Sequence, residues 1–170
     1  MIEYLPLVLT GLGLTASIIY YASVLRNQNK TRRLQMLQNM WEWISTEEGY
    51  LRMSELMKMH WKDYEDFNQK YGNQTHPKNY AMRWSVWNKM HGLGYMVKEG
   101  AIDVETVYEH SGARIIWLWT RFKPIILVIR EMGGSYALKW WEYLVDELEK
   151  VAEQRGDDFS NIPPAYTPSE

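Results

Sequence analysis

The sequence predicts an all-α protein, in which one N-terminal transmembrane helix is followed by a cytoplasmic bundle of about five helices. Apolar residues recur at spacings of three and four throughout the chain, and no hairpin dipeptide lies between alternating segments. The 22 residues from Tyr4 to Leu25 carry no charge. At about 1.5 Å per helical residue they reach about 33 Å, enough to cross a hydrocarbon layer of about 30 Å.

Four basic residues follow this apolar stretch and form the basic juxtamembrane cluster: Arg26, Lys30, Arg32 and Arg33. Lys and Arg near the end of a span favour the cytoplasmic side, so the N-terminus is expected outside and the rest of the chain in the cytoplasm. The cluster can also bind anionic lipid headgroups. A secretory signal peptide would carry its positive charge before a shorter apolar core. The reversed order here predicts a retained, single-pass anchor in the cell membrane.

Small residues within the predicted span are candidates for helix packing in the membrane: Gly11, Gly13, Ala16 and Ser17. Gly13 and Ser17 form a small-x-x-x-small pair that lets another membrane helix approach closely. Gly and Ala are also frequent in membrane helices for other reasons, so the pair leaves association and simple composition as open alternatives. Other membrane protein subunits are the expected partners.

The rest of the chain is expected to form one domain. Residues 1–33 comprise the anchor and its stalk, residues 34–156 the helical domain, and residues 157–170 a flexible tail with three prolines and no periodicity. A stripe with 3-4-3 spacing predicts that the anchor helix continues into the domain and packs in its core; it comprises Leu34, Leu37, Trp41 and Ile44.

Capping residues set the expected helix limits in the first half of the domain. Ser45 and Glu48 form a capping box that starts a helix, which continues with a bend to Tyr71. The next helix is expected over residues 78–99, after Pro77 and before Gly100, which can take the left-handed closing conformation.

In the second half, Asp103 is expected to cap a short helix that Gly112 ends. The helix over residues 115–129 is strongly apolar, but Arg121 and Lys123 in its middle argue against a second membrane pass, and Pro124 should kink or restart it. Gly133 and Gly134 end that helix. Ser135 can cap the last one, whose apolar stripe comprises Trp141, Leu144, Val145, Leu148, Val151 and Ala152.

The composition argues against several kinds of functional site. The chain has no cysteine, which excludes thiolate metal sites and cysteine nucleophiles, and a net charge of −2 without a basic stripe argues against nucleic-acid binding. None of its four histidines follows a Glu by three residues, so the di-metal bundle pattern is missing, and His91 is interpreted as a packing residue. A copper site around His60 is a weaker interpretation than core packing for the nearby methionines Met53, Met57 and Met59.

Nine Trp and twelve Tyr are an aromatic surplus for a chain of 170 residues. If these side chains do not all fit the core, some form an exposed patch of the kind that meets a protein partner or a membrane surface.

Several segments together resemble an uncharacterised family of small membrane-anchored helical proteins of archaea and bacteria, a domain of unknown function. They are YYASVLRNQNKTRR, DYEDFNQKYG, LGYMVKEGAIDVETVYEHSG, WTRFKPIILVIRE and WWEYLVDELEK. The resemblance covers nearly the whole chain up to Arg155. It implies an anchor followed by a helical domain, and it implies no activity for any residue.

The expected function is therefore a non-enzymatic interaction or scaffold protein at the cytoplasmic face of the membrane, with no cofactor and no small-molecule substrate identified. The alternative is an accessory subunit of a larger membrane enzyme, such as a respiratory or metal-dependent oxidase or monooxygenase. A metal protein or enzyme built around His91 or His60 is a third, weaker interpretation.

Overall fold

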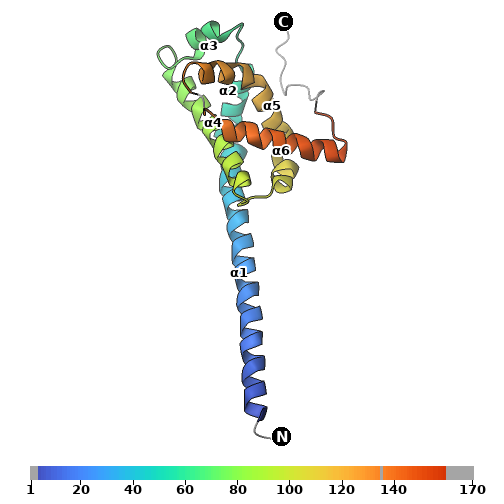
Figure 1. Cartoon of the computed structure of the whole chain (residues 1–170). Helices are drawn as coiled ribbons and strands as arrows, with labels where there is room; N and C mark the ends of the chain where they lie inside the picture. Colours follow the sequence, from blue (N-terminus) through green and yellow to red (C-terminus); the bar gives the residue numbers. More distant parts are fainter. Residues whose placement is uncertain (1–3, 135, 160–170) are drawn as a thin grey trace. The chain divides into compact units, whose positions relative to one another are not determined.

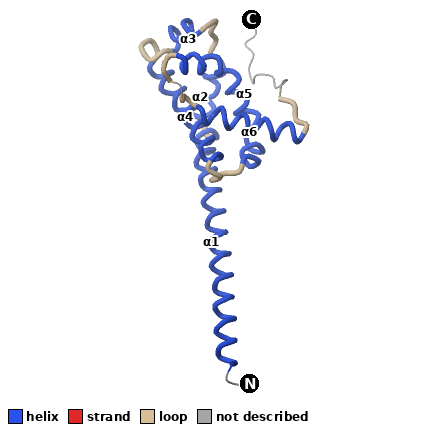
Figure 2. Tube along the Cα trace, in the orientation of Figure 1, coloured by secondary structure: helices blue, strands red, loops and turns tan. Residues whose placement is uncertain are grey.

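A computed structural model describes residues 4–134 and 136–159, and over these residues the chain is all-helical, with no strand, which confirms the all-α class (Figures 1 and 2). The chain divides into two compact units, residues 1–41 and residues 42–170. The described residues contain six helices: α1 (Leu5–Ser45), α2 (Glu47–Lys58), α3 (Tyr64–Tyr71), α4 (Pro77–Lys98), α5 (Val104–Glu131) and α6 (Lys139–Arg155).

Helix α1 runs without interruption for 41 residues, as the sequence predicts for an anchor that continues into the domain (Figure 1). The polar stretch at residues 27–31 does not break it. Leu37 and Trp41 are buried, but Leu34 is 54% exposed, so the expectation that Leu34 belongs to a core is wrong. The side chain of Ile44 lies outside the described residues. A 3.6-residue period places a side chain on a face, but it does not set how far along the helix that face is covered.

Helix α2 begins one residue later than the predicted capping box requires. Ser45 still belongs to α1, and the extended residue Thr46 caps α2 by accepting a hydrogen bond from the Gly49 N–H at 3.1 Å. Glu48 forms an ion pair with Arg52 one turn ahead instead of reaching back. The capping position therefore belongs to Thr46, because only the residue between two helices has the extended backbone that a cap needs.

The bend expected after α2 is a complete break over residues 59–63. Asp63 starts α3 by accepting a hydrogen bond from the Asp66 N–H at 2.9 Å. Helix α4 begins with Pro77 at its first position and ends before Gly100, which has φ +65°, so both predicted limits hold within one residue.

Helix α5 consists of two helical segments joined at a kink, as the sequence predicts, and the kink lies at Ser111, one residue before the expected break at Gly112. Asp103 caps it as expected, accepting from the Thr106 N–H at 2.8 Å. The irregular residue is Ser111 (φ −159°, ψ 16°), whose hydroxyl donates to the His110 carbonyl at 2.7 Å and so competes with the helical bonds. Gly112 makes room for the Tyr108 ring, since an added Cβ would lie 2.9 Å from Tyr108 Cδ2. Pro124 neither ends nor restarts the helix.

Helix α6 packs against both α4 and α5 and closes the core. All six residues of its predicted apolar stripe are buried. At the crossing with α4, a Cβ on Gly94 would lie 1.8 Å from the Trp140 carbonyl oxygen, so only glycine permits this approach. The predicted cap Ser135 lies outside the described residues. Helix α6 starts after Leu138, which has φ +56° and supplies no side-chain cap.

Candidate functional site

The small residues predicted for membrane packing all lie on α1 and are exposed. Helical geometry places Gly13, Ala16 and Ser17 on one side of α1, whereas Gly11 lies nearly opposite, about 160° away from Gly13 around the axis. The Ser17 hydroxyl donates to the Gly13 carbonyl at 2.8 Å, and the Thr15 hydroxyl donates to the Gly11 carbonyl at 2.9 Å. Both hydroxyls are therefore satisfied within α1, which lowers the cost of placing them in apolar surroundings.

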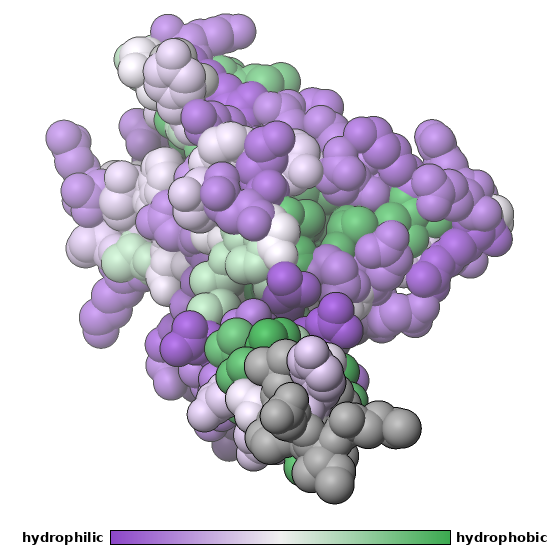
Figure 3. Space-filling model, turned by 60° about the horizontal axis from the view of Figure 1, so that its bottom comes forward, coloured by the Kyte–Doolittle hydropathy of each residue, from purple (hydrophilic) through white to green (hydrophobic). Residues whose placement is uncertain are grey.

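Large apolar side chains are exposed all around this part of α1. Their exposed fractions lie between 58% and 68%, and their positions cover every side of the helix: Leu9, Leu12, Leu14, Ile18, Ile19, Tyr20, Tyr21 and Leu25. Hydrophobic side chains of this segment are visible at the bottom of Figure 3, whereas the domain surface in that view is mostly hydrophilic. In the part of the chain that the structure describes, no helix is both long and apolar enough to cross a membrane.

The basic juxtamembrane cluster lies on the same continuous helix and is fully exposed. Arg26, Lys30 and Arg33 follow one stripe along α1, because they are spaced by four and three residues, and Arg32 lies about 100° to one side. None of the four forms an ion pair with a described residue. Their charges are therefore available to solvent or to anionic groups.

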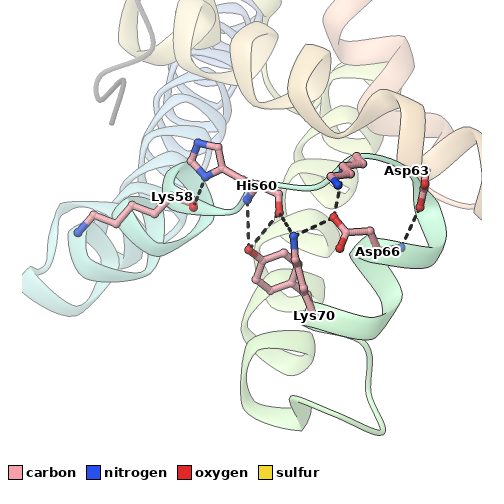
Figure 4. A network of polar contacts seen from close by, with 7 residues as sticks. Lys58, His60, Asp63, Asp66 and Lys70 are labelled. Atoms are coloured by element: carbon pink, nitrogen blue, oxygen red, sulfur yellow. Dashed lines mark hydrogen bonds and ion pairs between the residues drawn. The ribbon is translucent and has the colours of Figure 1, made fainter. Parts of the chain in front are cut away.

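His60 lies in the exposed link between α2 and α3 (Figure 4). Its Nδ1 lies 2.6 Å from the Lys58 carbonyl oxygen, and its backbone N–H donates to the Tyr71 hydroxyl at 3.1 Å. Lys70 bridges the link from α3, donating to the Asp66 carboxylate at 2.8 Å and to the His60 carbonyl at 3.4 Å. This network fixes the path of residues 58–63.

The sulfur of Met59, a candidate copper ligand, lies beside the Asn79 amide. Met59 is buried, and its sulfur accepts a long contact of 3.9 Å from the Asn79 amide. Among the described residues, no three His, Asp or Glu side chains gather in a way that could hold a metal ion. The geometry favours the core-packing interpretation of Met59 over a ligand role.

His91 has a structural partner at the start of α6. Its Nδ1 accepts a hydrogen bond from the Trp140 backbone N–H at 3.3 Å, so it supplies the cap that Leu138 cannot give. Burial lowers the pKa of His91, a hydrogen bond with the Leu138 backbone acts in the opposite direction, and the charge of Lys139 lowers the pKa further. The neutral imidazole is therefore the form that fits this position.

Two arginines that the sequence reasoning did not single out as functional stabilise the ends of helices. Arg83 is 2% exposed and donates to the Tyr71 carbonyl at the end of α3 at 3.0 Å, and Arg121 donates to the Met57 carbonyl at 2.9 Å and to the Met59 carbonyl. Helix C-termini carry partial negative charge, which explains how Arg83 can be buried, and Arg121 partly buried, without a carboxylate partner. Burial lowers the pKa of Arg83 to about 10. In the sequence, the one feature that distinguishes these two arginines is their position within apolar stretches.

Aromatic rings surround these two guanidinium groups. Arg83 lies 4.5 Å from the centroid of Phe67, Arg121 lies 5.2 Å from that of Trp61, and the Trp61 and Phe67 rings are themselves in contact at 5.1 Å. Four of the nine tryptophans are buried, four are partly exposed (Trp61, Trp84, Trp117 and Trp140), and the side chain of Trp43 lies outside the described residues. The core therefore absorbs part of the aromatic surplus and leaves part at the surface.

A shallow pocket of about 340 Å³ lies at the loop between α3 and α4. Amide and hydroxyl side chains line it, and it holds no histidine or carboxylate: Asn68, Gln69, Asn73, Gln74, Thr75 and Tyr80, with Gly72. This lining provides hydrogen bonds but no group for acid–base or nucleophilic catalysis.

Comparison of the chain with protein-family models, with curated proteins and with solved structures gave no match.

Proposed function

We propose that this protein is a non-enzymatic, membrane-anchored helical protein that binds other membrane proteins at the cytoplasmic face of the cell membrane. The uncharged stretch from Tyr4 to Leu25, most of it in α1, holds it in the membrane, with the N-terminus outside. The domain that follows serves as an interaction module.

The observation that carries the proposal is the exposure of large apolar side chains on every side of residues 9–25. A helix in a soluble protein normally has one polar face, whereas a helix that is apolar all round requires an apolar environment all round. The absence of charge from Tyr4 to Leu25 and the internally bonded hydroxyls of Thr15 and Ser17 support the same environment. The next experiment tests whether α1 is inserted in the membrane.

Alkaline carbonate extraction of membranes that contain the full chain tests the anchor. We expect the chain to remain in the membrane pellet, and we expect Leu14→Lys with Ile18→Lys to release it, because each charge costs about 2.5 to 3.5 kcal/mol at the centre of a span. The matched control is Gln35→Lys with Gln38→Lys, two exposed positions of α1 beyond the apolar stretch. Release of the unaltered chain by carbonate would contradict the anchor.

Mild detergent extraction followed by identification of co-purifying proteins tests the interaction role. A stoichiometric complex with enzymatic subunits would favour the alternative, an accessory subunit of a membrane enzyme. A free monomer with no partner would contradict both roles. The side of α1 with Gly13, Ala16 and Ser17 is the expected contact, since no described atom lies within 4 Å of a Cβ added at Gly13.

A further inference from the structure

The crossing of α4 and α6 places a group of aromatic and lysine side chains together at the surface. Gly94 allows the backbones to meet at Trp140, and the rings of Tyr95 and Trp140 then lie 5.9 Å apart. The group, here called the α4–α6 aromatic face, comprises Tyr95 and Lys98 of α4, Tyr136 and Lys139 before and at the start of α6, and Trp140 and Tyr143 of α6.

Direct contacts connect all six side chains. The Trp140 and Tyr143 centroids are 6.1 Å apart. The Lys98 Nζ lies 5.4 Å from the Tyr143 centroid, and the Lys139 Nζ lies 4.4 Å from the Trp140 centroid and 5.1 Å from the Tyr136 centroid. Tyr95 is 49% exposed and Tyr136 is 76% exposed, so these rings lie in water rather than in the core.

Two lysines give the α4–α6 aromatic face a positive charge. Neither Lys98 nor Lys139 forms an ion pair with a described residue. Of the nearby carboxylates, Glu142 is bound by Arg130 at 2.7 Å and Glu147 by Lys150 at 2.7 Å. Glu99 follows Lys98, and Asp146 lies one turn beyond Tyr143, so the positive region ends at the first turn of α6.

We infer that the α4–α6 aromatic face binds the headgroup region of an anionic membrane. Trp and Tyr rings with lysines beside them are the side chains found at membrane interfaces, where the ring lies among the headgroups and the ammonium group meets phosphate. Lysine is depleted at protein–protein interfaces, where arginine takes its place, and this difference favours lipid over a protein partner. Nucleic acid would require more cations than two.

The inference rests on the proposed anchor, because attachment of the domain to a membrane span raises the effective concentration of membrane surface and so strengthens weak contacts. The cytoplasmic leaflet carries the anionic lipids, which agrees with the proposed orientation. Each lysine near such a surface increases binding about fivefold.

Reconstitution of the full chain into vesicles tests the inference. We compare vesicles of phosphatidylcholine alone with vesicles that also contain phosphatidylserine, and measure acetylation of individual lysines by mass spectrometry. Lys98 and Lys139 should react roughly fivefold more slowly when phosphatidylserine is present. Lys78, an exposed residue at the start of α4, should react equally in both.

A charge-reversal variant gives the second measurement. Quenching of tryptophan fluorescence by brominated phosphatidylserine should be reduced when Trp140 is changed to Phe, and likewise when Lys98→Glu and Lys139→Glu are combined. The control Lys78→Glu should leave it unchanged, and far-UV circular dichroism checks that each variant is folded.

The two proposals fail in different ways. A chain that resists carbonate extraction but shows equal lysine reactivity in both kinds of vesicle would overturn the inference and leave the anchor standing. A chain that carbonate releases would overturn the anchor, and with it the tethering on which the inference rests.

Discussion

His91 couples the stability of the α4–α6 crossing to pH. Its Nδ1 can accept the Trp140 N–H only while the imidazole is neutral, and burial lowers its pKa below the ordinary value of 6.5. Between the folded pKa and 6.5 the unfolded chain binds more protons than the folded chain, so stability rises with pH there. The contribution is complete above pH 6.5 and is lost as the pH falls through the folded pKa.

We predict that His91→Asn removes this pH dependence. The Asn oxygen can replace Nδ1 as acceptor but does not titrate, so the free energy of unfolding should change less between pH 7.5 and pH 5 than in the unaltered chain. His91→Ala should lose the cap at every pH, at a cost of about 1 kcal/mol. Urea unfolding followed by circular dichroism at several pH values measures both, and an unchanged pH profile in His91→Asn would contradict the role.

Gly92 and Gly94 look equivalent in the sequence, yet their surroundings differ. Gly94 lies against the Trp140 backbone, whereas nothing lies within 4 Å of a Cβ added at Gly92. The helical period predicts which side of a helix a residue faces. How close the backbone of the neighbouring helix lies at that residue depends on the tertiary structure.

This difference predicts opposite effects for the same substitution. Gly94→Ala must displace the Trp140 backbone and should destabilise the domain by about 3 kcal/mol or more. Gly92→Ala adds a methyl in open space within a helix and should stabilise by up to about 1 kcal/mol. Thermal unfolding of the two variants side by side provides the measurement, with equal midpoints as the contradicting result.

The helices as elements were largely predictable, because their ends depend on local chemistry. The cap at Asp103, the proline at the first position of α4 and the glycines after α4 and α5 stand where the sequence places them. The break within α5 was predicted at Gly112 and lies one residue earlier, at Ser111, because glycine is the stronger helix breaker by composition. The buried arginines were missed because their partners are carbonyl groups brought near by folding.

At this scale we predict that Asp103→Ala weakens the start of α5 by about 1 kcal/mol. The carboxylate accepts both the N–H and the hydroxyl of Thr106, at 2.8 and 2.6 Å, and alanine leaves these donors without that acceptor. Asp103→Asn keeps an acceptor and should cost far less, which makes it the matched control. Hydrogen exchange of the first turn of α5 measures the effect, and equal protection in Asp103→Ala and the unaltered chain would argue against the cap.

For the whole molecule, the sequence predicted the helical class and the long first helix, whereas the role of that helix stays a prediction. The absence of charge over 22 residues and the cluster that follows are sequence features, and the structure adds that the large apolar side chains described there are exposed. Orientation depends on the membrane, which the chain alone does not contain.

The chain carries its own reporter of orientation. Asn73-Gln74-Thr75 is an N-glycosylation sequence in the exposed loop between α3 and α4. Translated with endoplasmic-reticulum microsomes, the chain should remain unmodified at Asn73, because the positive charge of the basic juxtamembrane cluster keeps the domain in the cytoplasm. All versions carry Asn29→Gln, which removes a second such sequence at residues 29–31.

Moving the positive charge to the other side of the predicted span should invert the orientation of the chain in the membrane. When the basic juxtamembrane cluster is changed to glutamine and Ile2 and Glu3 to lysine, the cytoplasmic preference moves to the N-terminus, and we expect most molecules to gain the mass of one glycan. Asn73→Gln in that inverted variant is the control and should abolish the gain. Glycosylation of the chain with its native charges would contradict the proposed orientation. If the variant with reversed charges inserts into the membrane but stays unglycosylated, the basic juxtamembrane cluster does not determine topology. An anchor whose orientation is set by charge must respond to a change of those charges.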